Sequence, residues 1–217
     1  MVVHCLFEQS GTFKNAFKKL GLNAFDYDIE GKETNVICDI FAEIKDFFNG
    51  EFSIFDRMQK NDIIIAFFPC TYFSNMSKLN SRGENKNVKL SNNDKLKNAA
   101  NLAAKRYEYF IFLLALIKIC YEKKLRLIVE NPYLDNYLLD YLPKCYEMVK
   151  FWNRQKYGDN YKKPTMFLFF NCTPKFSMLN ENIQFKNNNR IDNNKGFQRS
   201  LITSEFADFF IKNFIEL

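Results

Sequence analysis

The chain has little glycine and proline, with seven and five residues among 217. Disordered and low-complexity sequences are usually rich in these residues, so their scarcity indicates a folded chain. Hydrophobic residues make up 47% of the sequence and aromatic residues 17%, which is enough to fill a packed interior. The length suits one α/β domain, and we expect a single domain over residues 1–217.

Paired cysteines and a long apolar segment are also missing. The six cysteines include no CxxC pair, which predicts free thiols in a reducing compartment and no bound metal. The longest apolar run, residues 110–120, is too short to span a bilayer and is interrupted by Lys118. Residues 1–9 lack the basic and apolar regions of a signal peptide. We therefore expect a cytoplasmic protein that does not contact a membrane.

Acidic residues are the minority among the charged ones, and the formal net charge is +6. A mild excess of lysine suits a polyanionic partner such as nucleic acid. A solvated basic surface explains the same excess, and charge alone favours that simpler interpretation.

Strand-like and helix-like segments alternate along the chain. Residues 2–7 are apolar, residues 13–20 have the apolar spacing of a helix, and a second strand ends in Asp28. This order is the usual opening of a nucleotide-binding unit. The uninterrupted apolar runs at residues 62–68 and 125–129 predict central parallel strands that are covered on both faces.

The rest of the chain continues this alternation. We expect short or terminal strands at residues 36–39 and 166–170, helices at residues 41–48, 96–123, 137–142 and 204–216, and polar segments at residues 75–95 and 180–195. The whole pattern predicts one doubly wound, Rossmann-like α/β sheet.

Reactive side chains follow the predicted strands. Pro69 and Cys70 follow one central strand, and Glu130 and Asn131 follow the next. Ligands of open α/β sheets bind beyond the carboxyl ends of the strands. We therefore expect these residues to meet at one rim of the sheet.

These residues resemble motifs of the cytosine-5 DNA methyltransferases. Residues 7–21 (FEQSGTFKNAFKKLG) resemble the opening motif of that family, residues 69–74 (PCTYFS) are similar to its Pro-Cys-x-x-x-Ser loop, and Glu130-Asn131 match its Glu-Asn pair. Residues 157–165 stand where its Tyr-Gly motif belongs, and residues 199–205 resemble its closing segment. The motifs follow the family's order and cover nearly the whole chain.

The resemblance implies a class I methyltransferase sheet and S-adenosyl-L-methionine as the methyl donor. Cys70 would add to carbon 6 of cytosine, which lets carbon 5 attack the methyl group. Glu130 would hydrogen-bond the ring nitrogen and the exocyclic amine. Asn131 would hold the catalytic loop or the Pro69 carbonyl, and Lys163 stands where a family arginine stabilises the activated base.

The resemblance also implies a cofactor site at the first strand ends. The backbone of residues 8–11 would hold the methionine part, Asp28 would accept hydrogen bonds from the ribose hydroxyls, and Asp39 from the adenine amine. The implied cofactor-binding residues are Phe7, Glu8, Ser10, Gly11, Asp28, Asp39 and Pro69.

Each assignment has a structural alternative. Free cysteines such as Cys70 are often inert core residues, and aspartates such as Asp28 and Asp39 often form turns. Glu130 would otherwise cap a helix or pair with a lysine. The only histidine, His4, lies in an apolar run, and we expect it in the core or at a strand end.

The chain departs from the family in two respects. Gln9 and Thr12 replace glycines of the opening turn, and the Tyr-Gly motif lacks its glutamine and both arginines. Only about residues 171–199 remain for target recognition, too few for an ordinary recognition domain. This indicates short or relaxed recognition, a partner subunit that supplies it, or a small substrate.

Three functions therefore stay open. The first is an active cytosine-5 methyltransferase that acts on DNA, which on a duplex requires the base to be flipped out. The second is a catalytically inactive binding protein with the same fold. The third is an enzyme that modifies a free pyrimidine nucleotide, as the reduced recognition segment suggests.

Overall fold

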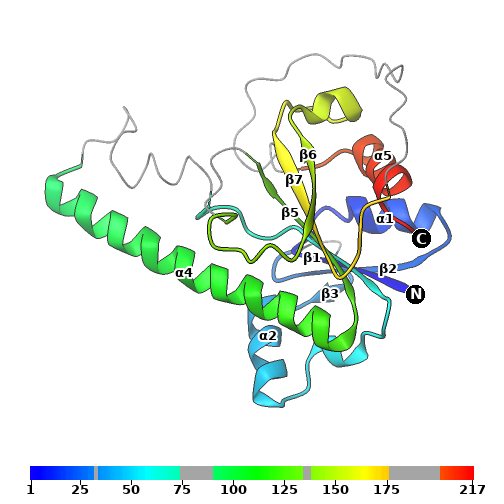
Figure 1. The fold of residues 1–217 in the computed structure, drawn as a ribbon, viewed down its shortest axis with the longest axis horizontal. Coiled ribbons are helices and arrows are strands. Elements are labelled where there is room, and N and C mark those ends of the chain that lie inside the picture. Colours follow the sequence, from blue (N-terminus) through cyan, green and yellow to red (C-terminus); the bar gives the residue numbers. More distant parts are fainter. Residues whose placement is uncertain (32–33, 74–89, 134–137, 176–200) are drawn as a thin grey trace.

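The computed structural model describes residues 1–31, 34–73, 90–133, 138–175 and 201–217, which form a seven-stranded sheet with helices on both faces (Figure 1). The strands are β1 (Val2–Leu6), β2 (Asn23–Asp28), β3 (Val36–Ile37), β4 (Ile63–Ala66), β5 (Arg126–Pro132), β6 (Glu147–Phe151) and β7 (Thr165–Phe170). The helices are α1 (Thr12–Lys19), α2 (Ile40–Asn49), α4 (Asn92–Lys123) and α5 (Ser204–Phe214), with 3-10 turns η1 (Ile54–Arg57) and η2 (Arg154–Tyr157).

The sheet is mixed but mostly parallel, with the strand order β3-β2-β1-β4-β5-β7-β6. The first five strands in this order pair in parallel, whereas β7 is antiparallel to both β5 and β6. β6 therefore runs in the same direction as β5, and the carboxyl ends of six strands share one rim. The order reverses between β1 and β4, where ligands of such sheets usually bind.

Two hydrophobic cores flank the sheet. One packs α2 and α4 against one face, and the other packs α1 and α5 against the opposite face. Successive β5 residues alternate between them, since Leu127 and Val129 belong to the first core and Ile128 to the second. This double coverage explains the uninterrupted apolar run that predicted a central strand. The prediction of a doubly covered α/β sheet is confirmed.

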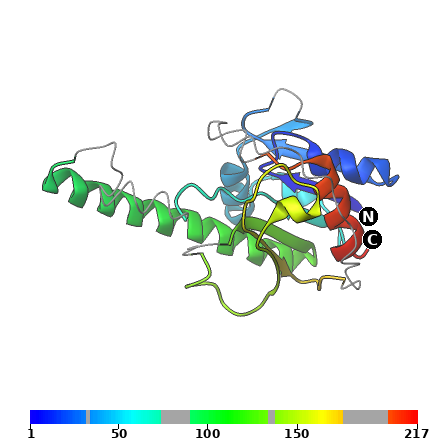
Figure 2. The same cartoon turned by 90° about the horizontal axis from the view of Figure 1, so that it is seen from above.

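Helix α4 extends beyond the sheet. Its N-terminal half projects away from the other elements (Figures 1 and 2), and its buried residues all lie between Leu113 and Cys120. The helix begins at Asn92, within the segment that we predicted as a loop. Ser91 caps this start by accepting a hydrogen bond from the Asp94 amide at 3.1 Å.

Two other details of the prediction are wrong. Residues 138–141 form a turn in place of the expected short helix, and Pro143 disfavours helical backbone immediately before it. Strand β6 was not predicted, because only Val149 and Phe151 of its five residues are buried. Residues 74–89 and 176–200 lie outside the described residues, and they include most of the polar segment 75–95 and of the expected recognition segment 171–199.

None of the described helices is both long enough and apolar enough to cross a bilayer.

All six cysteines are free thiols, as predicted. His4 is buried in β1, where its Nδ1 lies 2.9 Å from the Tyr27 hydroxyl and its Nε2 lies 3.6 Å from Asp62, so the core position that we expected is also confirmed.

Candidate active site

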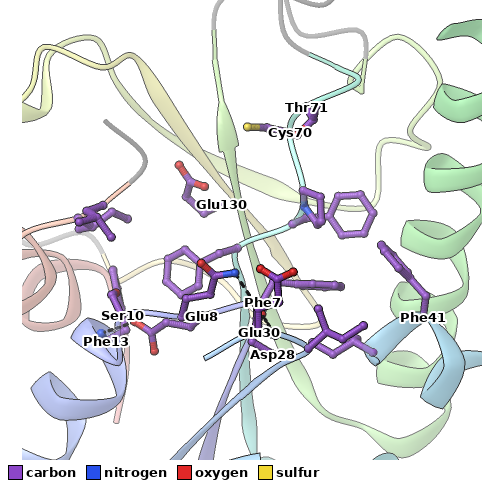
Figure 3. Close-up of a pocket in the computed structure, with 18 of the residues that line it drawn as sticks. Phe7, Glu8, Ser10, Phe13, Asp28, Glu30, Phe41, Cys70, Thr71 and Glu130 are labelled. Atoms are coloured by element: carbon purple, nitrogen blue, oxygen red, sulfur yellow. Dashed lines mark hydrogen bonds between the residues drawn. The ribbon is translucent and has the colours of Figure 1, made fainter. Parts of the chain in front are cut away.

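A cavity of about 740 Å³ opens beyond the carboxyl ends of the central strands (Figure 3). Nine predicted site residues line it: Phe7, Glu8, Ser10, Asp28, Asp39, Pro69, Cys70, Glu130 and Lys163. Gly11 and Asn131 do not line it, although each is adjacent in the chain to a residue that does, Ser10 and Glu130 respectively. The sheet thus gathers residues that are up to about 155 positions apart in the sequence.

The turn after β1 is organised by the Glu8 carboxylate. Its oxygens accept hydrogen bonds from the backbone amides of Phe13 at 2.7 Å and Lys14 at 3.2 Å, so Glu8 caps α1. Burial raises the pKa of Glu8, and these two hydrogen bonds oppose that rise. The amides at a helix start commonly bind phosphate, but here a buried carboxyl group already occupies them.

Gly11 is required by both backbone conformation and space. Its φ is +62°, which favours glycine. A Cβ at this position would lie 3.0 Å from Lys14 Cε and 3.3 Å from Asp26 Oδ2. Lys14 and Asp26 form a buried ion pair, in which Lys14 Nζ lies 2.7 Å from Asp26 Oδ2. Gly11 therefore allows the turn to pass over the Lys14–Asp26 pair.

The two aspartates of the cavity wall have structural roles as well. Asp28 Oδ1 accepts hydrogen bonds from Gln9 Nε2 at 3.3 Å and from the Glu30 amide at 2.7 Å. Asp39 Oδ1 caps α2 by accepting from the Phe41 amide at 2.9 Å. Asp28 therefore has the turn-forming role of the structural alternative, whereas Asp39 caps a helix, and both residues also line the cavity.

Cys70 follows β4 in a turn that the Phe73 amide closes by donating to the Cys70 carbonyl at 3.0 Å. Helix α4 holds this turn, since Arg106 Nε donates to the Tyr72 carbonyl at 2.7 Å. Burial raises the pKa of the Cys70 thiol, the negative charge of Glu130 raises it further, and Lys163 lowers it. Nucleophilic cysteines usually have a lowered thiol pKa, so this direction is opposite to the usual one.

Glu130 and Asn131 lie near the end of β5 and point to opposite faces of the sheet, as successive strand residues do. Glu130 is 7% exposed and projects toward the same cavity as Cys70 (Figure 3). Asn131 is buried and donates from Nδ2 to the Phe68 carbonyl at 2.9 Å. We expected Asn131 to hold the catalytic loop or the Pro69 carbonyl, and the observed acceptor is the carbonyl of the residue before Pro69.

A buried arginine lies behind Glu130. Arg154 in η2 is fully buried, and its Nε forms an ion pair with Asp159 Oδ2 at 2.7 Å. Its Nη1 lies 4.0 Å from Glu130 Oε1, and its guanidinium lies 5.5 Å from the Phe206 ring. Sequence reasoning missed Arg154 because arginine is usually exposed and no motif marks this position. It supplies positive charge close to residues 157–165, where this chain lacks the two arginines of the motif that the segment resembles.

Negative charge predominates around the cavity. Its lining carboxyl groups belong to Glu8, Asp28, Glu30, Asp39 and Glu130, whereas Lys163 is its only lysine or arginine among the described residues. Leu201 and Ile202, which sequence reasoning did not assign to the site, add an apolar wall ahead of α5. Such a cavity favours a cationic ligand with apolar parts over a phosphate-bearing one.

No protein-family model matches this chain, and no curated protein matches its sequence.

Proposed function

We propose that this protein is an S-adenosylmethionine-dependent methyltransferase that methylates carbon 5 of cytosine in DNA. The observation that carries this proposal is the shared cavity of Cys70 and Glu130. Cys70 follows β4, Glu130 lies near the end of the neighbouring parallel strand β5, and the charge of Glu130 acts on the Cys70 thiol. A nucleophile and a group that polarises the base are the two protein functions that the reaction needs.

The cavity fits the proposed methyl donor in charge. S-adenosylmethionine carries sulfonium and ammonium charges and no phosphate, which suits a wall with five carboxyl groups and one lysine. A dinucleotide suits it poorly, because the Glu8 carboxyl group already caps α1 at the usual pyrophosphate position. The sheet also differs from the usual dinucleotide-binding order, since the antiparallel β7 lies between β5 and β6.

The residues divide the chemistry between them. Cys70 Sγ forms a bond to carbon 6, and Glu130 hydrogen-bonds the ring nitrogen that takes up the displaced electrons. The bound cofactor supplies an electrophilic methyl group for carbon 5. The carbon 5 proton is then lost to water, the carbon 5–carbon 6 double bond forms again, and the Sγ–carbon 6 bond breaks to release the Cys70 thiolate. Asn131 supports this arrangement through its hydrogen bond to the Phe68 carbonyl, and Arg154 supports it through its position near Glu130.

A methyl-transfer assay tests the proposal. The protein is incubated with methyl-labelled S-adenosylmethionine and either mixed-sequence DNA or free cytosine nucleotides, with Cys70→Ser in parallel. We expect label in DNA that depends on Cys70 and is released as 5-methylcytosine after hydrolysis. Cofactor binding by Cys70→Ser provides the folding control. Label on nucleotides alone, or label on DNA that Cys70→Ser leaves unchanged, would contradict the proposal.

A binding protein without turnover is the second candidate function. The observation that favours it is the raised pKa of Cys70, which leaves the thiol protonated at neutral pH. Retained cofactor or DNA binding with no label transfer at any pH would support this candidate.

A further inference from the structure

An exposed group of aromatic and basic side chains lies outside the cavity. Trp152, the only tryptophan of the chain, is 61% exposed and packs edge-on against Tyr133, with ring centroids 4.8 Å apart and planes at 88°. Lys150 Nζ lies 4.6 Å from the centroid of the Tyr133 ring and 3.0 Å from its hydroxyl. We call Tyr133, Lys150 and Trp152 the aromatic–lysine patch.

The patch belongs to the same rim as the candidate active site. Tyr133 directly follows β5, three residues after Glu130, and Trp152 directly follows β6. The two strands run in the same direction, so their carboxyl ends lie at one edge of the sheet. The Tyr133 amide donates to the Pro164 carbonyl at 3.2 Å, and Pro164 follows the cavity residue Lys163. Tyr133 is therefore connected to the cavity wall in two ways, along the chain to Glu130 and through a hydrogen bond to the residue that follows Lys163.

The exposed charge within residues 148–163 is of one sign. Residues 148–163 include four lysines with side chains at least partly accessible, namely Lys150, Lys156, Lys162 and Lys163. The one acidic residue of this segment, Asp159, is buried and paired with Arg154. The segment thus presents lysines beside a large exposed aromatic face. Nucleic-acid strands are bound by this combination, because bases stack on aromatic rings and lysines contact phosphates.

We propose that the aromatic–lysine patch binds the DNA strand that flanks the reacting base. The substrate is then a polynucleotide, because a free nucleotide that occupies the cavity has no flanking base or phosphate to place on the patch. This inference rests on the proposed function only for the identity of the reacting base.

Trp152 reports on its own surroundings, since no other tryptophan contributes to the fluorescence. A cytosine-containing single-stranded oligonucleotide should quench this fluorescence in a saturable titration. Anisotropy of a labelled copy measures affinity independently. Trp152→Ala should weaken binding by about 5- to 100-fold, the range for loss of one stacked base, and Trp152→Phe should retain most of the affinity. Lys150→Met should make binding less dependent on salt.

Phe52→Ala is the matched control. Phe52 is also an exposed aromatic residue beside a cation, with Arg57 5.3 Å from its ring, but it precedes η1 and does not line the cavity. Its substitution should leave DNA affinity unchanged. Equal affinities for the wild type, Trp152→Ala and Tyr133→Ala would overturn the inference, as would tighter binding of an RNA strand of the same sequence.

Methyl transfer separates this inference from the proposed function. Normal methylation of DNA by Trp152→Ala at limiting DNA concentration would contradict the patch and leave the proposed function intact. Oligonucleotide binding that depends on Trp152, without any methyl transfer, would support the patch and contradict the proposed function.

Discussion

At the scale of single residues, the ionisation of Cys70 is decided by competing neighbours. Burial and the charge of Glu130 favour the neutral thiol, and Lys163 favours the thiolate. A nucleophilic cysteine reacts as the thiolate. The structure therefore couples the reactivity of Cys70 to the two other side chains that we assign to base activation.

The first prediction concerns alkylation of Cys70 by iodoacetamide, followed by peptide mass spectrometry across a pH series. Reactivity should increase with pH and have its midpoint above the ordinary value for cysteine. Glu130→Gln should shift the midpoint of Cys70 to lower pH, and Lys163→Met should shift it to higher pH. Cys172 in the same samples is the internal control, and its midpoint should stay fixed. Unchanged Cys70 midpoints in both variants would contradict the geometry of the site.

The second prediction concerns the buried pair of Arg154 and Asp159. Arg154→Met leaves a buried carboxylate without its ion-pair partner and should reduce the free energy of unfolding by about 3–5 kcal/mol in urea titrations. Burial raises the pKa of Asp159, and Arg154 opposes that rise. Removal of Arg154 raises this pKa further, so the loss should be smaller at pH 5 than at pH 8, because Asp159 takes up a proton at low pH.

Lys19→Met is the control for this pair. Lys19 and Asp208 form an exposed ion pair at 3.6 Å, and its loss should cost less than about 1 kcal/mol. Similar losses in the two variants, or a loss in Arg154→Met that does not depend on pH, would show that the Arg154 environment differs from the one described.

At the scale of elements, Asp39, the residue that caps helix α2, has two assigned roles. Asp39 caps the helix through the Phe41 and Ala42 amides and also lines the cavity. The cap requires only a short side chain with an oxygen, whereas contact with the adenine amine requires the longer carboxylate.

The third prediction separates these roles. Asp39→Ala should lose about 0.5–2 kcal/mol of stability, and Asp39→Ser, which keeps a capping oxygen, should lose much less. Both variants should bind S-adenosylmethionine about 3- to 10-fold more weakly, the range for one lost hydrogen bond. Thermal unfolding and calorimetry provide the two measurements. Full cofactor affinity in Asp39→Ser would mean that Asp39 is only a helix cap.

Elements that are buried on both faces were predictable from the sequence. β4 and β5 have uninterrupted apolar runs, and this pattern places Cys70 and Glu130 at neighbouring strand ends. β6 was not predictable, because at an edge position only two of its side chains are buried. Arg154 was also not predictable, because its burial depends on Asp159 and Phe206, which meet it only in the folded sheet. Sequence patterns therefore predicted six of the seven described strands and most of the cavity wall, but not β6 or the buried Arg154.

At the scale of the whole molecule, charge is distributed unevenly. The chain has a net charge of +6, yet the cavity wall carries five carboxyl groups and one lysine. Most basic residues lie elsewhere, and they include the exposed lysines Lys150, Lys156 and Lys162. This separation suits a cationic ligand inside the cavity and a polyanion at its rim.

The fourth prediction tests this separation by calorimetry. S-adenosylmethionine should bind more tightly than the uncharged-sulfur product S-adenosylhomocysteine at low salt. The difference should decrease between about 0.02 and 0.5 M NaCl, because salt screens the carboxylates. The dianionic dinucleotide NADH should not compete. Competition by NADH at a similar concentration would contradict the assignment of the cavity.

The most direct test of the central claim is covalent trapping on DNA that contains 5-fluorocytosine. Fluorine at carbon 5 prevents the loss of a proton there, so the Sγ–carbon 6 bond should persist after methyl transfer. We predict a protein–DNA adduct that survives denaturation, requires S-adenosylmethionine, maps to Cys70 and is absent in Cys70→Ser. Absence of an adduct with wild-type protein that binds both the cofactor and the DNA would contradict the account.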